Sequence, residues 1–132
     1  SIRIPHNSNN YRVDGNSINT FVLETASKHF SSFVGKNKIN LEDLDFIVFQ
    51  QTGHALVRAL VSVIELPEEK CPFVSKEYGN MSSASIPISI LKLNENHNKT
   101  RSLVLHSFGV GLASAICKLN LNNTVFSSII EM

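Results

Sequence analysis

Three short stretches of this chain carry the groups best suited to chemistry. Gln50 and Asn80 bear uncharged amides that both donate and accept hydrogen bonds. Asn80 stands just before an expected helix start, where the helix dipole favours negative charge. The third stretch is residues 108–111, Phe-Gly-Val-Gly, in which Gly109-Val110-Gly111 predicts a tight turn. No metal site is expected, because the histidines and cysteines are too dispersed to share an ion.

The pattern of apolar residues predicts the scaffold that would position these stretches. The expected helices are residues 18–34, 56–64 and 83–93, the first two ended by Gly35 and Pro67. The expected strands are residues 46–49, 102–107 and 112–119, with further candidates at 72–74, 124–126 and 129–130. Residues 1–12 are expected to be an irregular lead-in. This order predicts an α/β fold with a mixed sheet and layered helices.

The helix that begins near Ser83 is expected to be the buried centre of the fold. Gly79 and Asn80 signal a turn, and Ser82 or Ser83 can cap the first free N–H groups of the helix. The small residues at its start let other backbone approach closely. Because sites in open α/β sheets gather at the carboxyl ends of strands, we expect this turn and the other two stretches to converge.

At these stretches the chain resembles the ketoacyl-acyl-carrier-protein synthase III family of the thiolase-like superfamily. Residues 78–87, Tyr-Gly-Asn-Met-Ser-Ser-Ala-Ser-Ile-Pro, are similar to the family signature Tyr-Gly-Asn-Thr-Ser-Ala-Ala-Ser-Ile-Pro. Residues 46–53 resemble its Trp-Phe-Ile-Pro-His-Gln-Ala-Asn stretch, and residues 107–112 its Gly-Phe-Gly-Ala-Gly-Leu loop. The resemblance implies that residues 13–132 form the C-terminal half of a duplicated thiolase-like fold whose N-terminal half is absent.

The resemblance also implies a chemistry: an acyl group moves from a thioester to a cysteine, and a decarboxylated malonyl thioester then condenses with it. Asn80 would hydrogen-bond the thioester oxygen, and the main-chain N–H of Val110 would face the acyl-cysteine. Phe108, Gly109, Gly111 and His54 would line the substrate site. The substrates would be acyl thioesters of coenzyme A or an acyl carrier protein, with no further cofactor, as in fatty acid or polyketide-type biosynthesis.

Gln50 departs from the family pattern, because a histidine is expected at its position. Its amide can still donate to a thioester oxygen, but it cannot exchange a proton near neutral pH. His54 should lie in the first turn of the next helix on a different heading, so it is a poor substitute. Cys71 and Cys117 lie in no stretch like that of the nucleophile, and we expect each to be a buried or neutral thiol.

Composition excludes several other classes. The chain has 132 residues, 42% of them apolar, and a net charge of +1, so it can bury a core and is not expected to bind nucleic acid. No apolar run is long enough for a membrane span, and two cysteines fit a reducing, cytoplasmic compartment. Two functions stay open: one half of an acyltransferase or condensing enzyme, commonly a homodimer, or a non-catalytic partner subunit or acyl-carrier binding module. The chain alone is expected to be inactive.

Overall fold

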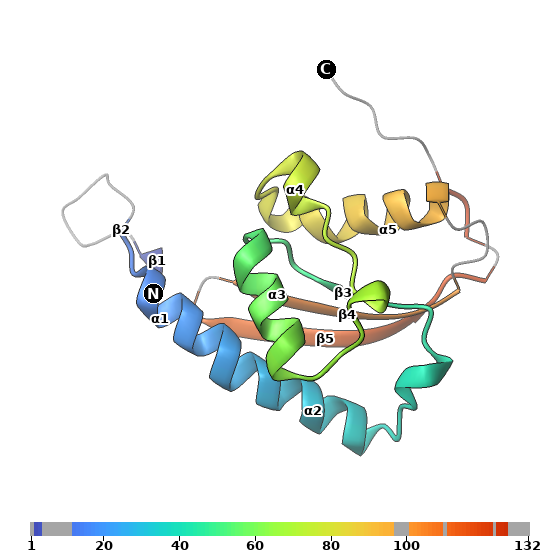
Figure 1. Ribbon diagram of the computed structural model, residues 1–132, viewed down its shortest axis with the longest axis horizontal. Helices are drawn as coiled ribbons and strands as arrows, with labels where there is room; N and C mark the ends of the chain where they lie inside the picture. Colours follow the sequence, from blue (N-terminus) through green and yellow to red (C-terminus); the bar gives the residue numbers. More distant parts are fainter. Residues whose placement is uncertain (1, 4–11, 97–100, 110, 123, 127–132) are drawn as a thin grey trace.

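The computed structural model describes residues 2–3, 12–96, 101–109, 111–122 and 124–126. Its centre is a mixed three-stranded sheet, in the order β3-β4-β5, between helices (Figure 1). The strands are β3 (Phe46–Phe49), β4 (Ser102–Gly109) and β5 (Ala113–Asn120). β3 runs parallel to β4, with Phe49 opposite His106, and β4 pairs with β5 in an antiparallel hairpin. The predicted α/β class and mixed sheet are confirmed.

One long helical segment covers the face of the sheet that lies lower in Figure 1. It consists of α1 (Gly15–Thr20), the π-helical turns η1 (Phe21–Ala26) and α2 (Ser27–Lys36). Asp14 caps it by accepting the main-chain N–H of Ser17. Val22, Ala26 and Phe30 recur at intervals of four residues and are buried against the sheet. The predicted helix is confirmed, but Gly35 lies inside its last turn rather than ending it.

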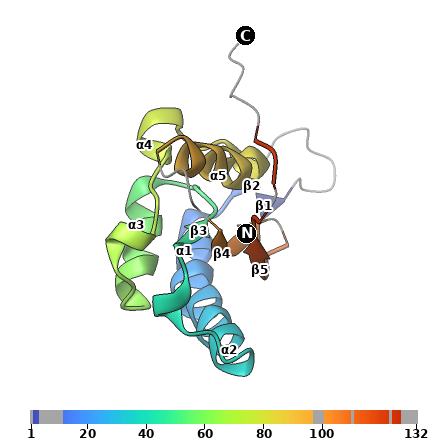
Figure 2. The same cartoon turned by 90° about the vertical axis from the view of Figure 1, so that its right-hand side faces the viewer.

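The remaining helices include one beside the long segment and one on the opposite face of the sheet. They are α3 (His54–Val63), the 3₁₀ turns η2 (Leu41–Asp43), η3 (Glu68–Lys70) and η4 (Ser82–Ala84), α4 (Ser75–Tyr78) and α5 (Ser85–Asn96). Figure 2 shows the strands between α5 on one side and α2 on the other, with α3 flanking them. Residues 72–74 form no strand and lead instead into α4, so that expectation was wrong. The expected strand at residues 124–126 is also absent, and residues 129–130 lie outside the described part.

The expected lead-in contains two short paired strands, β1 (Ile2–Arg3) and β2 (Arg12–Val13), the second of which reaches one residue past it. The residues between these two strands lie outside the described part of the chain. Within the described residues, no helix is both long and apolar enough to cross a membrane.

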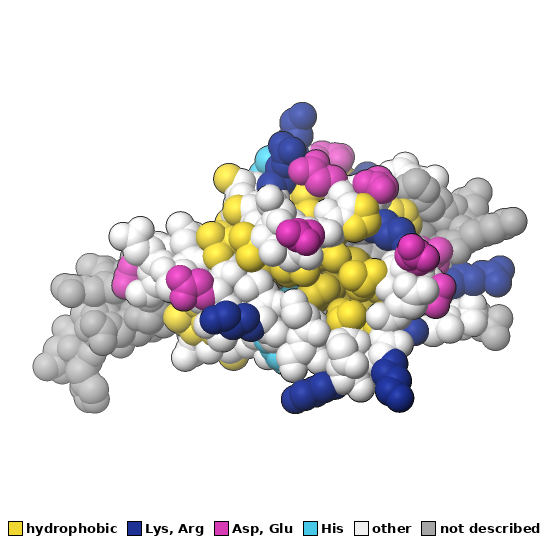
Figure 3. All heavy atoms as spheres, turned by 60° about the horizontal axis from the view of Figure 1, so that its bottom comes forward, with side chains coloured by type: hydrophobic (Ala, Val, Ile, Leu, Met, Phe, Trp, Pro, Cys, Tyr) yellow, Lys and Arg dark blue, Asp and Glu magenta, His cyan; other side chains and the backbone are white. Residues whose placement is uncertain are grey.

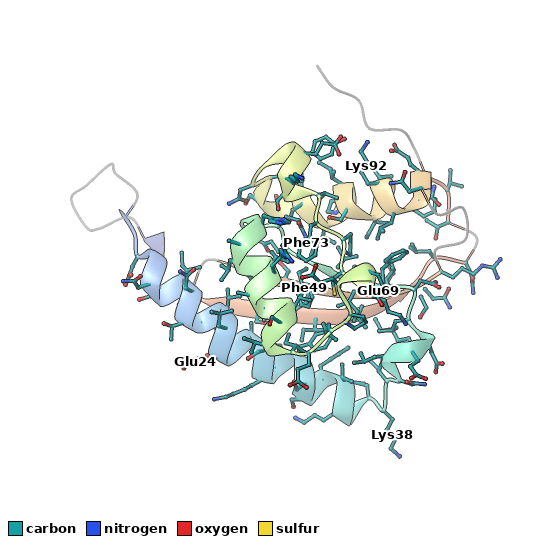
Figure 4. All side chains as sticks on the ribbon, in the orientation of Figure 1. Glu24, Lys38, Phe49, Glu69, Phe73 and Lys92 are labelled. Atoms are coloured by element: carbon teal, nitrogen blue, oxygen red, sulfur yellow. The ribbon has the colours of Figure 1, made fainter. Side chains whose placement is uncertain are left out.

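The hydrophobic core lies between the sheet and the lower helices. Phe30 and Phe49 meet there at a ring-centroid distance of 5.8 Å, and Figure 4 shows Phe49 in the interior between α3 and the strands. On the α5 side only one stripe of the helix is buried, namely Ser85, Ser89 and Leu93. The helix predicted as the buried centre is therefore buried on one side only. Figure 3 shows another face, where hydrophobic side chains gather in the middle and charged side chains surround them.

Candidate active site

A cavity of about 320 Å³ lies at the carboxyl ends of β3 and β4, where α1, η1 and the 3₁₀ turn η4, which leads into α5, meet them. Its lining residues are Ile18, Phe21, Val22, Gln50, Thr52, Asn80, Ser82, Ser83, Ser107, Phe108, Gly109 and Leu112. None of these side chains is ionisable, so the cavity is a neutral environment. Among its polar groups, the buried hydroxyl oxygen of Thr52 has no hydrogen-bond partner within the part of the chain that the structure describes. The predicted stretches at Gln50 and Asn80 both reach the cavity. The third stretch reaches it through Phe108 and Gly109.

Gln50 is held from the strand beside it. It follows the last registered residue of β3, so it lies level with Ser107 on the parallel strand β4. Its main-chain N–H donates to the carbonyl oxygen of His106 at 2.9 Å. Its Oε1 accepts the Ser107 hydroxyl at 2.6 Å and the Phe108 main-chain N–H at 3.3 Å. Among the described residues, nothing accepts a hydrogen bond from its Nε2, and the amide NH₂ group is free for a ligand.

Asn80 is oriented in a similar way by the turn before α5. Gly79 precedes it with φ = +69°, in a region that side-chain-bearing residues rarely adopt, which lets the chain reverse after α4. The Oδ1 of Asn80 accepts the main-chain N–H of Ser82 at 2.9 Å. The expected side-chain cap by Ser82 or Ser83 is not formed, and the Ser82 N–H is instead satisfied by the Asn80 side chain. Within the described part of the chain, the Asn80 NH₂ group has no acceptor.

Ser85 joins the loop after β3 to the start of α5. Its hydroxyl donates to the carbonyl oxygen of Ser82 at 2.8 Å and accepts the main-chain N–H of Gln51 at 3.2 Å. The side chain is fully buried. A small polar residue is needed here because the two backbones approach one another, as the run of small residues predicted. This contact fixes the segment that carries Gln50 relative to the segment that carries Asn80.

Gln51 has a structural role, in contrast to its neighbour Gln50. It is fully buried, and its Nε2 donates to the carbonyl oxygens of Phe49 and Pro72 at 2.9 and 3.1 Å. Its Oε1 accepts the main-chain N–H of Ser75 at 3.3 Å. Both ends of this amide are occupied, so it ties the loop before α4 to β3 and has nothing to offer a ligand.

The other predicted site residues are divided between the cavity and its surroundings. Phe108 and Gly109 line the cavity. Val110, whose main-chain N–H was expected to act, lies outside the described residues. Gly111 has φ = +111°, as a turn glycine can adopt, and does not line the cavity. His54 begins α3 and is exposed. Its ring packs edge-on against that of Phe73 at a centroid distance of 5.2 Å, and it does not line the cavity either. Figure 4 shows Phe73 beside α3.

Behind the cavity lies a histidine cluster that the sequence analysis did not foresee. The Ser114 hydroxyl lies 2.8 Å from Nε2 of His106 and 2.8 Å from Nδ1 of His29. His106 is fully buried, and the rings of Phe30, Phe49 and Phe108 lie 5.5–6.0 Å from its ring. Burial first, and then the charge of His29, lower the pKa of His106 to about 4, so it is neutral at ordinary pH. The only sequence signal was alternation along β4, which places residues 104, 106 and 108 on the core face.

Neither cysteine is placed as a nucleophile would be. Cys71 is buried, and its burial, with the nearby charges of Glu69 and Glu68, raises the pKa of its thiol to about 12. Cys117 is exposed on β5, so of the two cysteines only Cys71 is buried. Within the described residues, no three His, Cys, Asp or Glu side chains lie together as a metal site requires.

Comparison with known proteins connects this geometry to a family. A family model for the C-terminal part of 3-oxoacyl-[acyl-carrier-protein] synthase III matches residues 34–121. The beta-ketoacyl-[acyl-carrier-protein] synthase III of Campylobacter concisus is 33% identical over 115 residues, which cover 84% of this chain and 34% of the relative. The beta-ketoacyl-[acyl-carrier-protein] synthase III of Streptococcus sanguinis is 29% identical over 108 residues, which cover 76% of this chain and 32% of the relative. This chain therefore spans about a third of the length of these relatives.

Solved structures show the same relationship. A 3-oxoacyl-(acyl-carrier protein) synthase from Burkholderia xenovorans superposes with a TM-score of 0.77 and 29% identity over 83% of this chain and 32% of its own. The 3-oxoacyl-(acyl carrier protein) synthase III of Pseudomonas aeruginosa superposes with a TM-score of 0.79 and 23% identity, over 90% of this chain and 39% of its own. The second likeness shows the fold alone. The fold around the cavity is thus a thiolase-like half.

Proposed function

Since this chain belongs to the 3-oxoacyl-[acyl-carrier-protein] synthase III family, through its C-terminal domain, we propose that it is the carbonyl-binding half of an acyltransferase or condensing enzyme. Its substrates are acyl thioesters of an acyl carrier protein or of coenzyme A. Gln50 and Asn80 are its donors to the thioester oxygen, and Val110 supplies a main-chain N–H.

The observation that supports this proposal most directly is the hydrogen bonding of two side-chain amides, Gln50 and Asn80, that line one cavity. The oxygen of each amide is already occupied by protein donors, so each offers only its NH₂ group. Two such donors match the two lone pairs of a carbonyl oxygen. The turn η4 at the cavity leads directly into α5, so the positive end of that helix dipole lies on the same side and favours negative charge on that oxygen. A donor placed in this way is worth roughly 3 kcal/mol of activation free energy in related acyl-transfer chemistry.

Gln50 restricts the chemistry that this half can perform. An amide can stabilise an enolate oxygen, but it cannot pass a proton to or from it near neutral pH. The buried His106 does not replace it, because its ring lies behind Phe108 and stays neutral. Transfer of an acyl group to an acceptor needs no proton from this position. It is therefore the reaction that this half supports best.

The proposal assigns the remaining parts to an N-terminal half. The nucleophilic cysteine belongs there, because Cys71 is buried and protonated and Cys117 lies away from the cavity. The N-terminal half covers an apolar groove of about 190 Å³ between α5 and the sheet. Residues that line this groove include Ile86, Leu105 and Cys117. The joined protein is a homodimer in the reducing cytoplasm, where its thiols stay free.

A second function is favoured by the absence of ionisable groups among the described residues that line the cavity. Such a cavity can bind a thioester carbonyl without turning it over. The protein would then be a non-catalytic family member that serves as a partner subunit or binds an acyl carrier.

Covalent labelling separates the two functions. The chain joined to its N-terminal half is incubated with acyl-coenzyme A radiolabelled in the acyl group, and protein-bound label is measured after denaturation. We expect one label per chain on a cysteine outside residues 1–132, and no label on this chain alone. Reversible binding without covalent label would support the non-catalytic function. Label on Cys71 or Cys117 would contradict both.

A further inference from the structure

We propose that Ser107 is a positioning residue for Gln50: its hydroxyl, together with the Phe108 main-chain N–H, turns the NH₂ group of Gln50 toward the cavity. The use of this NH₂ group to bind a thioester rests on the proposed function, whereas the orientation of the amide rests on its contacts alone. Without a device of this kind, a glutamine amide could present either its oxygen or its nitrogen to a ligand, since the two ends have nearly the same shape.

The main-chain N–H of Phe108 determines which end of the Gln50 amide faces β4. The Phe108 N–H is a donor that cannot change its role, and it lies 3.3 Å from Gln50 Oε1. If the amide were flipped, this buried residue's N–H would face the NH₂ group, donor against donor, and would lose its acceptor. The flipped amide is therefore disfavoured, and Nε2 is left on the cavity side.

Ser107 strengthens this choice and limits the motion of the amide. Its hydroxyl donates to the same oxygen at 2.6 Å, the shorter of the two contacts. A hydroxyl can reverse its role, so alone it would not select an orientation. Combined with the Phe108 N–H, it gives Oε1 two donors and saturates both lone pairs. The two contacts come from consecutive residues of β4, which is why the register that places Ser107 level with Gln50 matters.

The consequence is a fixed donor whose strength does not depend on pH. No ionisable side chain takes part in the contact, and none among the described residues lines the cavity. A thioester carbonyl would meet the same NH₂ group under all conditions in which the protein is folded. The neighbouring Gln51 is a built-in reference, because its amide is held at both ends and does not depend on Ser107.

Nuclear magnetic resonance of the ¹⁵N-labelled 132-residue chain, without ligand, tests the inference in two ways. In the unaltered chain, the Nε2 protons of Gln50 should show only a weak nuclear Overhauser effect to the Phe108 N–H. A strong effect would mean a flipped amide and would overturn the proposal. This first measurement needs no variant and does not depend on how well a variant folds.

The second measurement compares Ser107→Ala with Ser107→Thr. The order parameter of the Gln50 side-chain amide should be near that of rigid backbone, about 0.85, in the unaltered chain and in Ser107→Thr. It should fall below about 0.6 in Ser107→Ala, while that of Gln51 stays unchanged in all three. An unchanged Gln50 amide in Ser107→Ala would refute the role of Ser107. Because no ligand is used, that failure is separate from a failure of thioester binding, which the labelling experiment measures.

Discussion

Lowering the pH from about 7.5 to about 4.5 should destabilise this protein through His106. The imidazole is fully buried and bonded through Nε2 to Ser114, and its buried Nδ1 has no hydrogen-bond partner among the described residues. Folding lowers its pKa from 6.5 to about 4, chiefly because burial disfavours the charged ring. A proton therefore binds the unfolded chain more tightly than the folded one. The contribution of His106 to stability is complete above pH 6.5 and is lost as the pH falls toward 4.

The magnitude follows from the size of the shift. Each pKa unit is worth about 1.4 kcal/mol, so the full effect is about 3 kcal/mol, and about 2.5 kcal/mol of it is lost by pH 4.5. Urea unfolding followed by far-ultraviolet circular dichroism at a series of pH values measures the loss. His106→Phe places an aromatic ring among Phe30, Phe49 and Phe108 and removes the titration, so its stability should fall less over this range. Equal losses in the two proteins would refute the reasoning.

Three substitutions, two of them paired with a control variant, test other parts of the structure by urea unfolding. Gly79→Ala should cost about 1–3 kcal/mol, because φ is +69° there, whereas Gly35→Ala in the helical α2 should cost nothing. Gln51→Leu should cost about 2 kcal/mol or more, because it leaves three main-chain groups without their partners. Lys70→Met should cost about 2 kcal/mol, since Nζ of Lys70 donates to three carbonyl oxygens before β3 at 2.8–2.9 Å. The exposed Lys76→Met is its control and should be neutral, and a similar loss in Lys76→Met would remove the explanation for Lys70.

The sequence predicted the main helices and strands of this fold because each carries a recognisable apolar pattern. The helical segment at residues 15–36 buries Val22, Ala26 and Phe30 at intervals of four, and β3 is a continuous apolar run. The error at residues 72–74 has a physical cause: Pro72 uses its carbonyl oxygen to accept from Gln51 in a loop, and none of the described strands pairs with this segment. A short apolar run carries no information about its partners.

The candidate site could be predicted in part. Gln50 and Asn80 follow recognisable signals, and the structure places both on one cavity. The role of Ser107 and the histidine cluster could not be foreseen, because each depends on register between segments far apart in the chain. Ser114 reaches His106 only through the pairing of β4 with β5, and it reaches His29 only because α2 packs on that strand.

The central claim is that two amide NH₂ groups, on Gln50 and Asn80, bind one thioester carbonyl oxygen. Infrared spectroscopy of acyl-coenzyme A carrying a ¹³C-labelled carbonyl, bound to the chain joined to its N-terminal half, tests this directly. We predict a carbonyl stretch below its value in water, which Gln50→Leu and Asn80→Leu each partly restore. A stretch that neither substitution changes, with the ligand still bound, would contradict the account.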